Sequence, residues 1–483
     1  MAVAALIGFA LLGRSGPPPG VPVVPTVSPG AEAEPLADPF AYRRDRGEEF
    51  AERAAFGVAH PLYVNSPGGA VATAERTAAW RPLVERAARR AGVDPDRLEG
   101  LVFLESSGRP DAVTPSGLDG AVGLTQILAE TGRNLLGMRV DLDESRRLTR
   151  RMERAQRRGQ AALAERLEDR RRRIDERFDP ALSLAASARY LTMARERFGR
   201  EDLAFVSYHM GQGNLEGVLR DFSGRDGGDV GDVVADEELD WPRVYFDSTP
   251  RRHRAAYRRL ASFGDDSSNY LWKVEAGREI MRLWRDDRDE LVRTADLQTA
   301  KASAEEVLHP PGETTSFRTP DELREAWDDD DIRALPDDPG ATALDRHRGM
   351  GELARRLDEP IALYRGLRPE ALALALYIGA QVRNAAGGGT LTMTSTVRDQ
   401  AYQSLLIGGN EQATRGYSLH TTGYAFDVAR LYDSRRQALA FQWVLDRLRI
   451  LGVIAWVREP QAIHITVGDD ADALLPLLDR HPG

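Results

Sequence analysis

Residues 94–107 read DPDRLEGLVFLESS, and residues 108–127 continue as GRPDAVTPSGLDGAVGLTQI. The first stretch predicts a helix, because Asp94 is a good N-cap residue and Pro95 suits the first helical position, where a missing N–H costs nothing. The second stretch is rich in glycine and proline and predicts a loop in which backbone can approach a ligand. We therefore expect a helix whose last turn opens into a ligand-binding loop.

An acidic residue lies on the apolar stripe of this helix. Leu98, Leu101 and Val102 mark the inward face, and the next position on that face is Glu105. A carboxylate there is either paired with a cation or kept partly protonated by desolvation. A general acid for glycosidic cleavage needs the second state, because it must still hold a proton near neutral pH. The residues alone leave both states open.

The stretch from Leu104 to Ile127 resembles the soluble lytic transglycosylase family, whose pattern is Glu-Ser followed by Ser-x-x-Gly-Ala-x-Gly-Leu-Met-Gln. Later signatures of that family recur here in the same order: Phe178-Asp179-Pro180 with Ala188-Arg189-Tyr190-Leu191, then Tyr208-His209-Met210-Gly211-Gln212-Gly213-Asn214, then Asn269-Tyr270-Leu271-Trp272-Lys273-Val274. Two departures are that Thr125 replaces the Met and that His209-Met210 replaces an Asn-Ala pair.

The resemblance implies a mainly α, lysozyme-like domain that acts on peptidoglycan glycan strands. Glu105 would protonate the oxygen between N-acetylmuramic acid and N-acetylglucosamine, then take the proton of the sugar's own C6 hydroxyl, which gives a 1,6-anhydro product. The residues implied to position the sugar or orient Glu105 are Ser106, Gln126, Tyr208, Asn214 and Tyr270. An ordinary glycosidase needs a second placed carboxylate, for which Asp119 is the only nearby candidate. A muramidase-type hydrolase and a non-catalytic wall-binding scaffold stay open as alternatives.

A second constellation lies near the C-terminus, where residues 418–427 read SLHTTGYAFD and His464 lies in a later apolar run. A catalytic zinc needs three nitrogen or oxygen ligands and one open position. His420, Asp427 and His464 can supply them. The run resembles the zinc D-Ala-D-Ala peptidases with a hedgehog-like fold, whose pattern is Ser-x-His-x-x-Gly-x-Ala-x-Asp followed by a strand His. The resemblance implies a bound zinc and stem peptides as partners.

Other positions of this second resemblance match less evenly. Ser395 and Arg398 resemble the family's Ser-x-x-Arg segment, in which the Arg holds a substrate carboxylate. Many members carry a general-base Glu three residues before the last ligand, where this chain has Gln461, and others carry a His two residues before it, where it has Ala462. Glu459 is the nearest acid and our candidate for the base. The alternative is a degenerate domain that only binds wall peptides.

The chain is long enough for several domains. We expect a signal- or anchor-like apolar segment over residues 1–15, a Pro-rich tether over 16–40, the lysozyme-like domain over 41–290, a linker over 291–345 and an α+β domain over 346–483. In the last of these, helical patterns (369–382 and 435–451) alternate with short β-like runs (390–395, 424–428, 454–457 and 462–467).

An arginine-rich helical insertion is expected at about residues 140–177. Residues 146–177 hold 13 Arg against six acidic residues. One interpretation is a solvated helical hairpin, and the other is a patch that attracts anionic wall polymers or a lipid surface.

Composition narrows the partners and the location. The net charge of -10 argues against general nucleic-acid binding, which needs a basic footprint. The chain has no cysteine, which excludes disulfides, thiol nucleophiles and thiolate metal sites. The apolar run at residues 2–12 is too short to span a bilayer but is typical of a secretory signal. We therefore expect an exported, periplasmic or cell-envelope protein. In one alternative, the same segment anchors the protein to the membrane.

Overall fold

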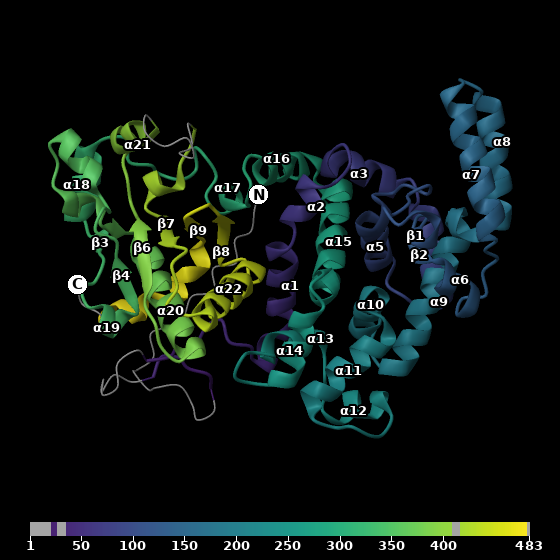
Figure 1. Ribbon diagram of the computed structural model, residues 1–483, viewed down its shortest axis with the longest axis horizontal. Coiled ribbons are helices and arrows are strands. Elements are labelled where there is room, and N and C mark those ends of the chain that lie inside the picture. Colours follow the sequence, from purple (N-terminus) through teal and green to yellow (C-terminus); the bar gives the residue numbers. More distant parts are fainter. Residues whose placement is uncertain (1–20, 27–34, 408–415, 481–483) are drawn as a thin grey trace. The chain divides into compact units, whose positions relative to one another are not determined.

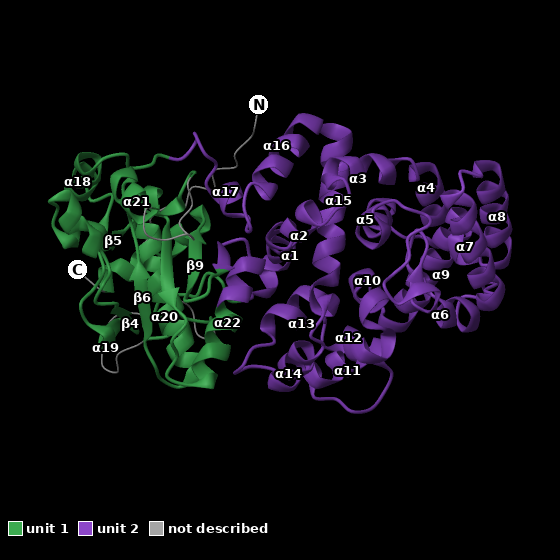
Figure 2. Cartoon of the chain, turned by 45° about the horizontal axis from the view of Figure 1, so that its top comes forward, with its two compact units in different colours: residues 1–41, 315–444, 458–483 green, residues 42–314, 445–457 purple. Residues whose placement is uncertain are grey.

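The computed structural model describes residues 21–26, 35–407 and 416–480 (Figure 1). The chain divides into two compact units (Figure 2). One, here called the helical unit, comprises residues 42–314 and 445–457. The other, here called the α/β unit, comprises residues 1–41, 315–444 and 458–483, of which only the described ones are discussed. No helix in the described part is long and apolar enough to cross a membrane.

The helical unit confirms the predicted helical pattern. Its helices are α1 (Gly47–Gly57), α2 (His60–Val64), α3 (Gly69–Ala78), α4 (Arg81–Ala91), α5 (Pro95–Ser106), α6 (Ala129–Asn134), α7 (Leu142–Arg157), α8 (Ala161–Ile174), α9 (Pro180–Phe198), α10 (Glu201–Met210), α11 (Gln212–Ser223), α12 (Val230–Asp236), α13 (Trp241–Asp247), α14 (Arg254–Ser262), α15 (Tyr270–Asp286), α16 (Arg288–Thr299) and α17 (Glu305–Leu308). A two-stranded ribbon joins β1 (Ala121–Val122) to β2 (Ile127–Leu128).

Two glycines let helices α5 and α15 pack backbone to backbone. A Cβ on Gly100 would lie 2.5 Å from the carbonyl oxygen of Val274, and a Cβ on Gly277 would lie 2.8 Å from the carbonyl oxygen of Gly100. Such distances exclude any larger side chain without movement of the helices. This close packing brings the end of α5 next to the start of α15, where the candidate site lies.

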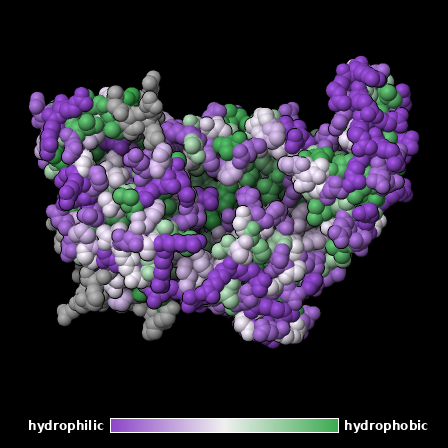
Figure 3. All heavy atoms as spheres, viewed as in Figure 1, coloured by the Kyte–Doolittle hydropathy of each residue, from purple (hydrophilic) through white to green (hydrophobic). Residues whose placement is uncertain are grey.

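The arginine-rich block forms the predicted helical hairpin from α7 and α8, which projects from the rest of its unit (Figure 1). Its two helices share a small core of Leu148, Ala155, Ala164 and Leu167. The outer surface of the hairpin is largely hydrophilic (Figure 3).

The α/β unit is built on a sheet with strand order β4-β6-β7-β9-β8. Its strands are β4 (Leu344–Arg346), β6 (Leu391–Ser395), β7 (Ala425–Ala429), β8 (Ile454–Arg458) and β9 (Ala462–Val467), and a separate pair joins β3 (Arg333–Ala334) to β5 (Gly366–Leu367). Its helices are α18 (Pro320–Asp328), α19 (Pro339–Thr342), α20 (Pro369–Ala386), α21 (Gln400–Ile407) and α22 (Arg435–Ile450). The division into units assigns residues 445–457, which include the end of α22 and all of β8 except Arg458, to the helical unit.

The prediction of a linker over residues 291–345 is wrong. Residues 291–345 contain most of α16 together with α17, α18 and α19, and the boundary between the two units falls after residue 314. Phe317, Leu323 and Ile332 are buried in one apolar cluster of the α/β unit. Two prolines of this segment stand at helix starts, and several of its acidic residues lie on exposed helix faces. Composition alone does not distinguish such a segment from a linker.

The expected tether also differs where it is described. Val24 and Phe40 are buried, and Val23 bridges to Ala37. The Asp38 carboxylate accepts a hydrogen bond from the hydroxyl of Tyr377 on α20 at 3.1 Å. These parts of residues 16–40 therefore pack onto the α/β unit instead of forming a free spacer. The signal-like segment, residues 1–15, lies outside the described residues.

Candidate functional site

Helix α5 begins and ends as its sequence predicts. The Asp94 carboxylate accepts a hydrogen bond from the backbone N–H of Asp96 at 2.8 Å and caps the helix. Leu98, Leu101 and Val102 are completely buried. The helix stops at Ser107, which adopts a left-handed conformation with φ 55°. Glu105 lies in the last turn, and its side chain is half-buried.

The carboxyl group of Glu105 is bound by a tyrosine and by no cation. The hydroxyl of Tyr270, at the start of α15, donates to its Oε1 at 2.5 Å. Among the described residues, no arginine, lysine or histidine forms an ion pair with Glu105. Desolvation by burial raises the pKa of Glu105 to about 7, although the hydrogen bond from Tyr270 acts in the opposite direction. The group therefore exchanges its proton near neutral pH.

Aromatic rings surround Tyr270. Tyr208 stacks on it with ring centroids 6.3 Å apart, and His209 stacks at 5.1 Å with planes 10° apart. Tyr190 packs its edge against Tyr208 at 5.3 Å. Burial, together with the charge of Glu105, raises the pKa of both Tyr208 and Tyr270. Both hydroxyls therefore stay protonated and can donate hydrogen bonds at any physiological pH.

A chain of buried hydroxyl groups fixes Tyr208. Its hydroxyl donates to the backbone carbonyl of Thr125 at 2.8 Å and lies 2.8 Å from the Ser187 hydroxyl. The Thr125 hydroxyl lies 2.8 Å from that of Ser187 and 2.6 Å from that of Ser183. The sequence analysis missed Ser183 and Ser187, although hydroxyl residues spaced four apart on an otherwise apolar helix face are a signal for such a network. Thr125, which stands where the resembled family has Met, is the central member of this hydroxyl network.

Three of the expected positioning residues bond to nearby backbone. The side-chain amide of Gln126 donates to the carbonyls of Ala112 and Gly123, at 3.3 and 2.8 Å. Ser106 donates to the carbonyl of the residue four before it at 3.2 Å, and Asn214 does the same at 2.9 Å. The structure thus brings Glu105, Tyr270 and Tyr208 together, and it gives Ser106, Gln126 and Asn214 bonds that shape their own segments.

A buried arginine that the sequence analysis missed holds the loop of residues 117–127. The guanidinium of Arg177 is completely buried and donates to three loop carbonyls, at 3.2 Å to Leu118 and 3.3 Å to both Gly120 and Ile127. Its charge is matched by Asp175, with two contacts of 2.9 Å. The only signal was an Arg beside the Phe-Asp-Pro motif, hidden among many exposed arginines.

Glycine is required where the loop passes this arginine. A Cβ on Gly123 would lie 1.9 Å from the carbonyl oxygen of Arg177, and its φ of +82° favours glycine as well. This close backbone contact explains the second glycine of the Gly-Ala-x-Gly motif. It places the loop directly against the start of the segment that leads into α9.

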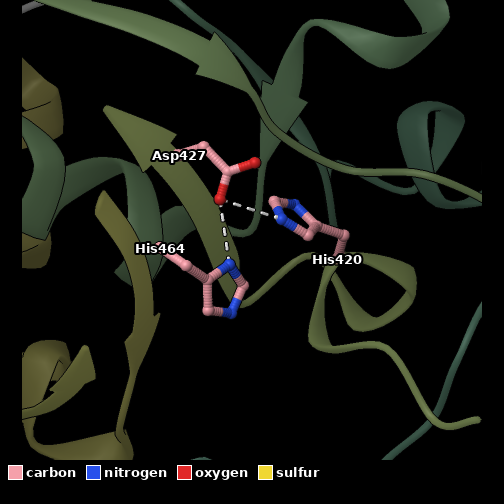
Figure 4. Close-up of side chains that lie close together, drawn as sticks. All are labelled: His420, Asp427 and His464. Carbon is pink, nitrogen blue, oxygen red and sulfur yellow. Dashed lines mark hydrogen bonds and ion pairs between the residues drawn. The ribbon is translucent and has the colours of Figure 1, made fainter. Parts of the chain in front are cut away.

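The second candidate site lies in the α/β unit, where three side chains converge (Figure 4). Asp427 on β7 and His464 on β9 are paired opposite each other in the antiparallel register, and His420 comes from the short 3-10 helix η7 (Leu419–Thr422). Asp427 Oδ1 lies 2.9 Å from His464 Nδ1 and 3.2 Å from His420 Nε2. The predicted trio is therefore one cluster, with one potential ligand atom from each residue within 4.8 Å of the others.

The hydrogen bonds of His420 leave one nitrogen for a cation. Its Nδ1 lies 2.8 Å from the carbonyl oxygen of Thr396, which can only accept, so Nδ1 carries the proton. In a neutral imidazole Nε2 then presents a lone pair to the carboxylate of Asp427, a repulsion that a cation held between the two groups would relieve. Burial and the charge of Arg398 lower the pKa of His420 to about 4. The donor set of two imidazoles and a carboxylate fits zinc.

Arg398 and Ser395 lie beside this cluster, as predicted. Arg398 donates to Ser395 Oγ at 2.6 Å and to Gln403 Oε1 at 2.9 Å, and it approaches Asp427 Oδ2 at 3.4 Å. Ser395, Arg398 and Asp427 line a cavity of about 450 Å³, with Tyr402 among its other walls. A guanidinium at the wall of a cavity next to three potential metal ligands is suited to holding a carboxylate.

Glu459 lies in the turn between β8 and β9, where its backbone N–H donates to the carbonyl of Ala462 at 2.9 Å. It is outside the cluster of three potential ligands. Its charge acts on Arg398: burial lowers the pKa of that guanidinium, and Asp427, Tyr402 and Glu459 oppose the shift. The role of Glu459 as a base stays a prediction.

Comparison with known families bears on the helical unit. The family model of the Transglycosylase SLT domain matches residues 158–227. The matched residues include α8 to α11 and contain Tyr208 and Asn214, whereas Glu105 and Tyr270 lie outside them. The match supports a lysozyme-like, transglycosylase-type unit that acts on peptidoglycan in the cell envelope. The helical unit is thus similar to the Transglycosylase SLT domain, and this similarity supports a peptidoglycan-cleaving function.

Proposed function

We propose that the helical unit is a lytic transglycosylase that cleaves the β-1,4 bond between N-acetylmuramic acid and N-acetylglucosamine and forms 1,6-anhydro-N-acetylmuramic acid. The observation that carries the proposal is the state of Glu105: a desolvated carboxyl with a pKa of about 7, bonded to Tyr270 and free of any cation among the described residues. Such a group holds a proton for the leaving oxygen and becomes a base once it has lost it.

The reaction needs only this one carboxyl group. Glu105 gives its proton to the bridging oxygen, the bond from that oxygen to C1 of the muramic acid breaks, and the N-acetylglucosamine leaves with a 4-hydroxyl. The C6 hydroxyl of the same muramic acid then bonds to C1 and returns its proton to Glu105. Because the nucleophile is part of the substrate, its effective concentration at C1 is high without a second catalytic residue. Tyr270 orients the carboxyl through its 2.5 Å hydrogen bond.

A hydrolytic mechanism is less well supported, because it needs a second carboxylate beside the scissile bond. Asp119, the candidate from the sequence, is ion-paired with Arg146 and its side chain is 65% exposed. A carboxylate engaged at the surface by a guanidinium is a poor base for water. The lytic product is therefore the one we expect.

Product analysis tests this proposal. Purified sacculi are digested with the wild-type protein and with Glu105→Gln, and the soluble fragments are examined by mass spectrometry. Anhydro-muropeptides are expected from the wild type and should be absent with the variant. Fragments with reducing ends, each 18 Da heavier, would instead indicate a muramidase. No fragments of either kind would favour the wall-binding scaffold.

We propose further that the α/β unit binds zinc through His420, Asp427 and His464 and acts on, or binds, stem peptides. The support is the geometry of the cluster, the lone pair that His420 Nε2 presents to it, and the neighbouring cavity with Arg398 in its wall. A zinc ion bound there would activate a water molecule and polarise a peptide carbonyl. Arg398 would hold the terminal carboxylate of the peptide, and Glu459 is the nearest acid to serve as a base.

A metal assay tests the zinc site, and a peptide assay distinguishes a unit that cleaves stem peptides from one that only binds them. We expect one zinc per chain by mass spectrometry of the purified protein, and release of D-Ala from a pentapeptide if the unit is a peptidase. Binding of the peptide without release would indicate a degenerate, peptide-binding unit. Absence of stoichiometric metal at neutral pH would overturn the metal site.

Peptidoglycan, the substrate that the helical unit is proposed to cleave, lies outside the cytoplasmic membrane. We propose that the chain is exported to the cell envelope, with the apolar start as signal or anchor. Fractionation of cells that express the full chain would test this: the protein should be found in the periplasmic or membrane fraction, and recovery in the cytoplasm alone would contradict export.

A further inference from the structure

The distal half of the α7–α8 hairpin carries positive charge that the chain itself does not neutralise. Residues 150–166 contain six arginines and two acidic residues. No ion pair involves these arginines in the described part of the chain: Arg150, Arg151, Arg154, Arg157, Arg158 and Arg166. All six are exposed. This basic tip contrasts with the net charge of -10 of the whole chain, so it is a local feature.

The arginines near the base of the same hairpin behave differently. Arg146 pairs with Asp119, Arg147 and Arg170 pair with Glu144, and Arg172 pairs with Glu168 at 2.6 Å. Arg173, at the base, is the exception, because it is exposed and has no ion pair among the described residues. The exposed arginines without an ion pair are thus mainly at the far end, where the spacing of three and four residues along α7 puts several guanidinium groups on neighbouring positions of one side.

Buried hydrogen bonds and an ion pair join the hairpin to the loop of residues 117–127, next to Glu105. Ser145 on α7 donates to Asp175 at 2.8 Å, and Asp175 pairs with Arg177, which holds the carbonyls of loop 117–127. Arg171 lies over the ring of Phe178 at 3.8 Å. Helix α7 has 16 residues and rises 1.5 Å per residue, so the tip lies about 20 Å from Ser145. The tip is held at a fixed distance from the catalytic loop.

We infer that the basic tip binds the free carboxylates of stem peptides on the glycan strand that occupies the site, and so extends the substrate contact beyond the sugars. The inference rests on the proposed cleavage of peptidoglycan. Uncross-linked stem peptides repeat several carboxylates along a strand, and guanidinium groups recognise carboxylates bidentately. The substrate class is thus the peptide-bearing strand, and bare glycan is the poorer substrate.

The surface of the hairpin favours such a polymer over a membrane. Among the described residues, the large apolar side chains that are exposed lie outside residues 142–174. Surface-bound amphipathic helices need apolar side chains on one face to enter the lipid boundary. The exposed side of the hairpin is hydrophilic instead (Figure 3). A hydrated polyanion suits this surface.

Kinetics on two forms of the same strands test the inference. The native form carries free stem-peptide carboxylates, and in the second form carbodiimide coupling to methylamine has converted them to neutral amides. The tested variant is the quadruple Arg150, Arg151, Arg154 and Arg157→Gln, since glutamine keeps the helix propensity. The control neutralises four exposed, unpaired arginines of α4 and α14 in the same unit, Arg86, Arg90, Arg254 and Arg258→Gln, and changes the net charge equally.

The quadruple tip variant should raise KM on native strands about threefold to tenfold at low salt, with kcat unchanged, because each exposed charge contact is individually weak. The difference from wild type should shrink in high salt and vanish on amidated strands. The control variant should behave as wild type.

Equal KM for wild type and tip variant on native strands, or an equal increase in the control, would overturn the inference. An increase in KM of the tip variant that persists on amidated strands would also overturn it. A third contradicting result would be an unchanged KM on native strands, with the tip arginines instead required for binding to poly(glycerol phosphate) or to anionic phosphatidylglycerol vesicles. Failure of the wild type to cleave either form would instead contradict the proposed function itself.

Discussion

At the scale of single residues, two opposing effects set the acidity of Glu105. Removal from water favours the neutral carboxyl, and the hydrogen bond from Tyr270 favours the ionised one. Desolvation is the larger effect, which leaves the pKa at about 7 against an ordinary value of 4.5. The apolar stripe of α5 predicted the burial of this residue, but the partner on α15, 165 positions away, could not be deduced from spacing.

Tyr270→Phe should separate these effects. Loss of the hydroxyl removes the hydrogen bond that lowers the pKa of Glu105, so the alkaline limb of the pH–rate profile should move to higher pH. We expect kcat to fall about tenfold, because the carboxyl also loses its orientation. Steady-state rates on sacculi between pH 4 and 9 would show both changes. Tyr63→Phe, a buried tyrosine of α2 far along the chain, serves as a control for general loss of packing; an unmoved limb in Tyr270→Phe would contradict the assignment.

Glu105 should also make stability depend on pH. Its pKa is raised on folding, so the folded chain retains a proton that the unfolded chain loses, and stability is lost as pH rises from about 4.5 through about 7. Glu105→Gln removes this dependence. At pH 8 the variant should be more stable than wild type by about 3 kcal/mol, and at pH 4 the two should be nearly equal. Urea unfolding at both pH values measures it; the same difference at both would contradict a raised pKa.

At the scale of elements, the loop of residues 117–127 depends on a buried ion pair that joins it to the hairpin. Arg177 bonds to three loop carbonyls while Asp175 bonds to Arg177 and to Ser145 of α7. The loop and the α7–α8 hairpin are thus joined by one buried network. A buried pair of this kind gives geometry more than net stability, because both charges lost their water on folding.

Arg177→Met should be costly, because it leaves Asp175 buried and unpaired and three carbonyls without a donor. We expect a loss of about 3–5 kcal/mol in the free energy of unfolding. Arg172→Met on the same hairpin, whose ion pair is partly exposed, should cost less than about 1 kcal/mol. Chemical denaturation of both variants measures the difference, and similar losses would show that the buried pair has no special role.

Periodicity and end signals predicted the elements whose bounds could be drawn from the sequence. Helix α20 was expected to begin at Pro369, strand β9 matches the expected run 462–467, and the arginine-rich block forms the expected hairpin. The errors lie where composition replaced pattern. Residues 315–345 look like a linker because charge and proline dominate, yet a few apolar side chains such as Phe317 and Leu323 anchor them in a core. Tertiary burial of so few residues leaves no periodic signal.

For the candidate sites, the residues proposed to carry the chemistry came from the sequence, whereas the residues that hold them in place did not. Glu105, Tyr208 and Tyr270 meet, as do His420, Asp427 and His464. The supports were missed: the Ser187 hydroxyl behind Tyr208, and the Thr396 carbonyl behind His420. They act through backbone or through small hydroxyls, which occur too widely in sequences to be informative.

At the scale of the whole molecule, the two candidate chemistries lie in separate units and use unrelated residues. One unit would cut glycan with a carboxyl group, and the other would act on peptides with a metal. Both substrates belong to the same wall polymer, so a single chain could open it at two kinds of bond. Among the described residues, the side chains named for the first site all belong to the helical unit, and those named for the second site all belong to the α/β unit.

The two functions should therefore be separable by mutation. His420→Ala should abolish zinc binding and lower the melting temperature of zinc-treated protein, while the rate of glycan cleavage stays within about twofold of wild type. Glu105→Gln should do the reverse and keep one zinc per chain. Elemental analysis and a sacculus-release assay on both variants provide the readouts. Loss of glycan cleavage in a folded His420→Ala protein would show that the units are coupled.

The most direct measurement is the pH dependence of kcat/KM for release of anhydro-muropeptides, since this quantity reports ionisation of the free enzyme. With Glu105 as the acid, the rate should be constant at mildly acidic pH and fall tenfold per unit above a pKa of about 7, and Glu105→Gln should be inactive throughout. A fall that begins near 4.5, the ordinary pKa of a glutamic acid, or anhydro products from Glu105→Gln, would contradict a buried, protonated Glu105 as the group that cleaves the strand.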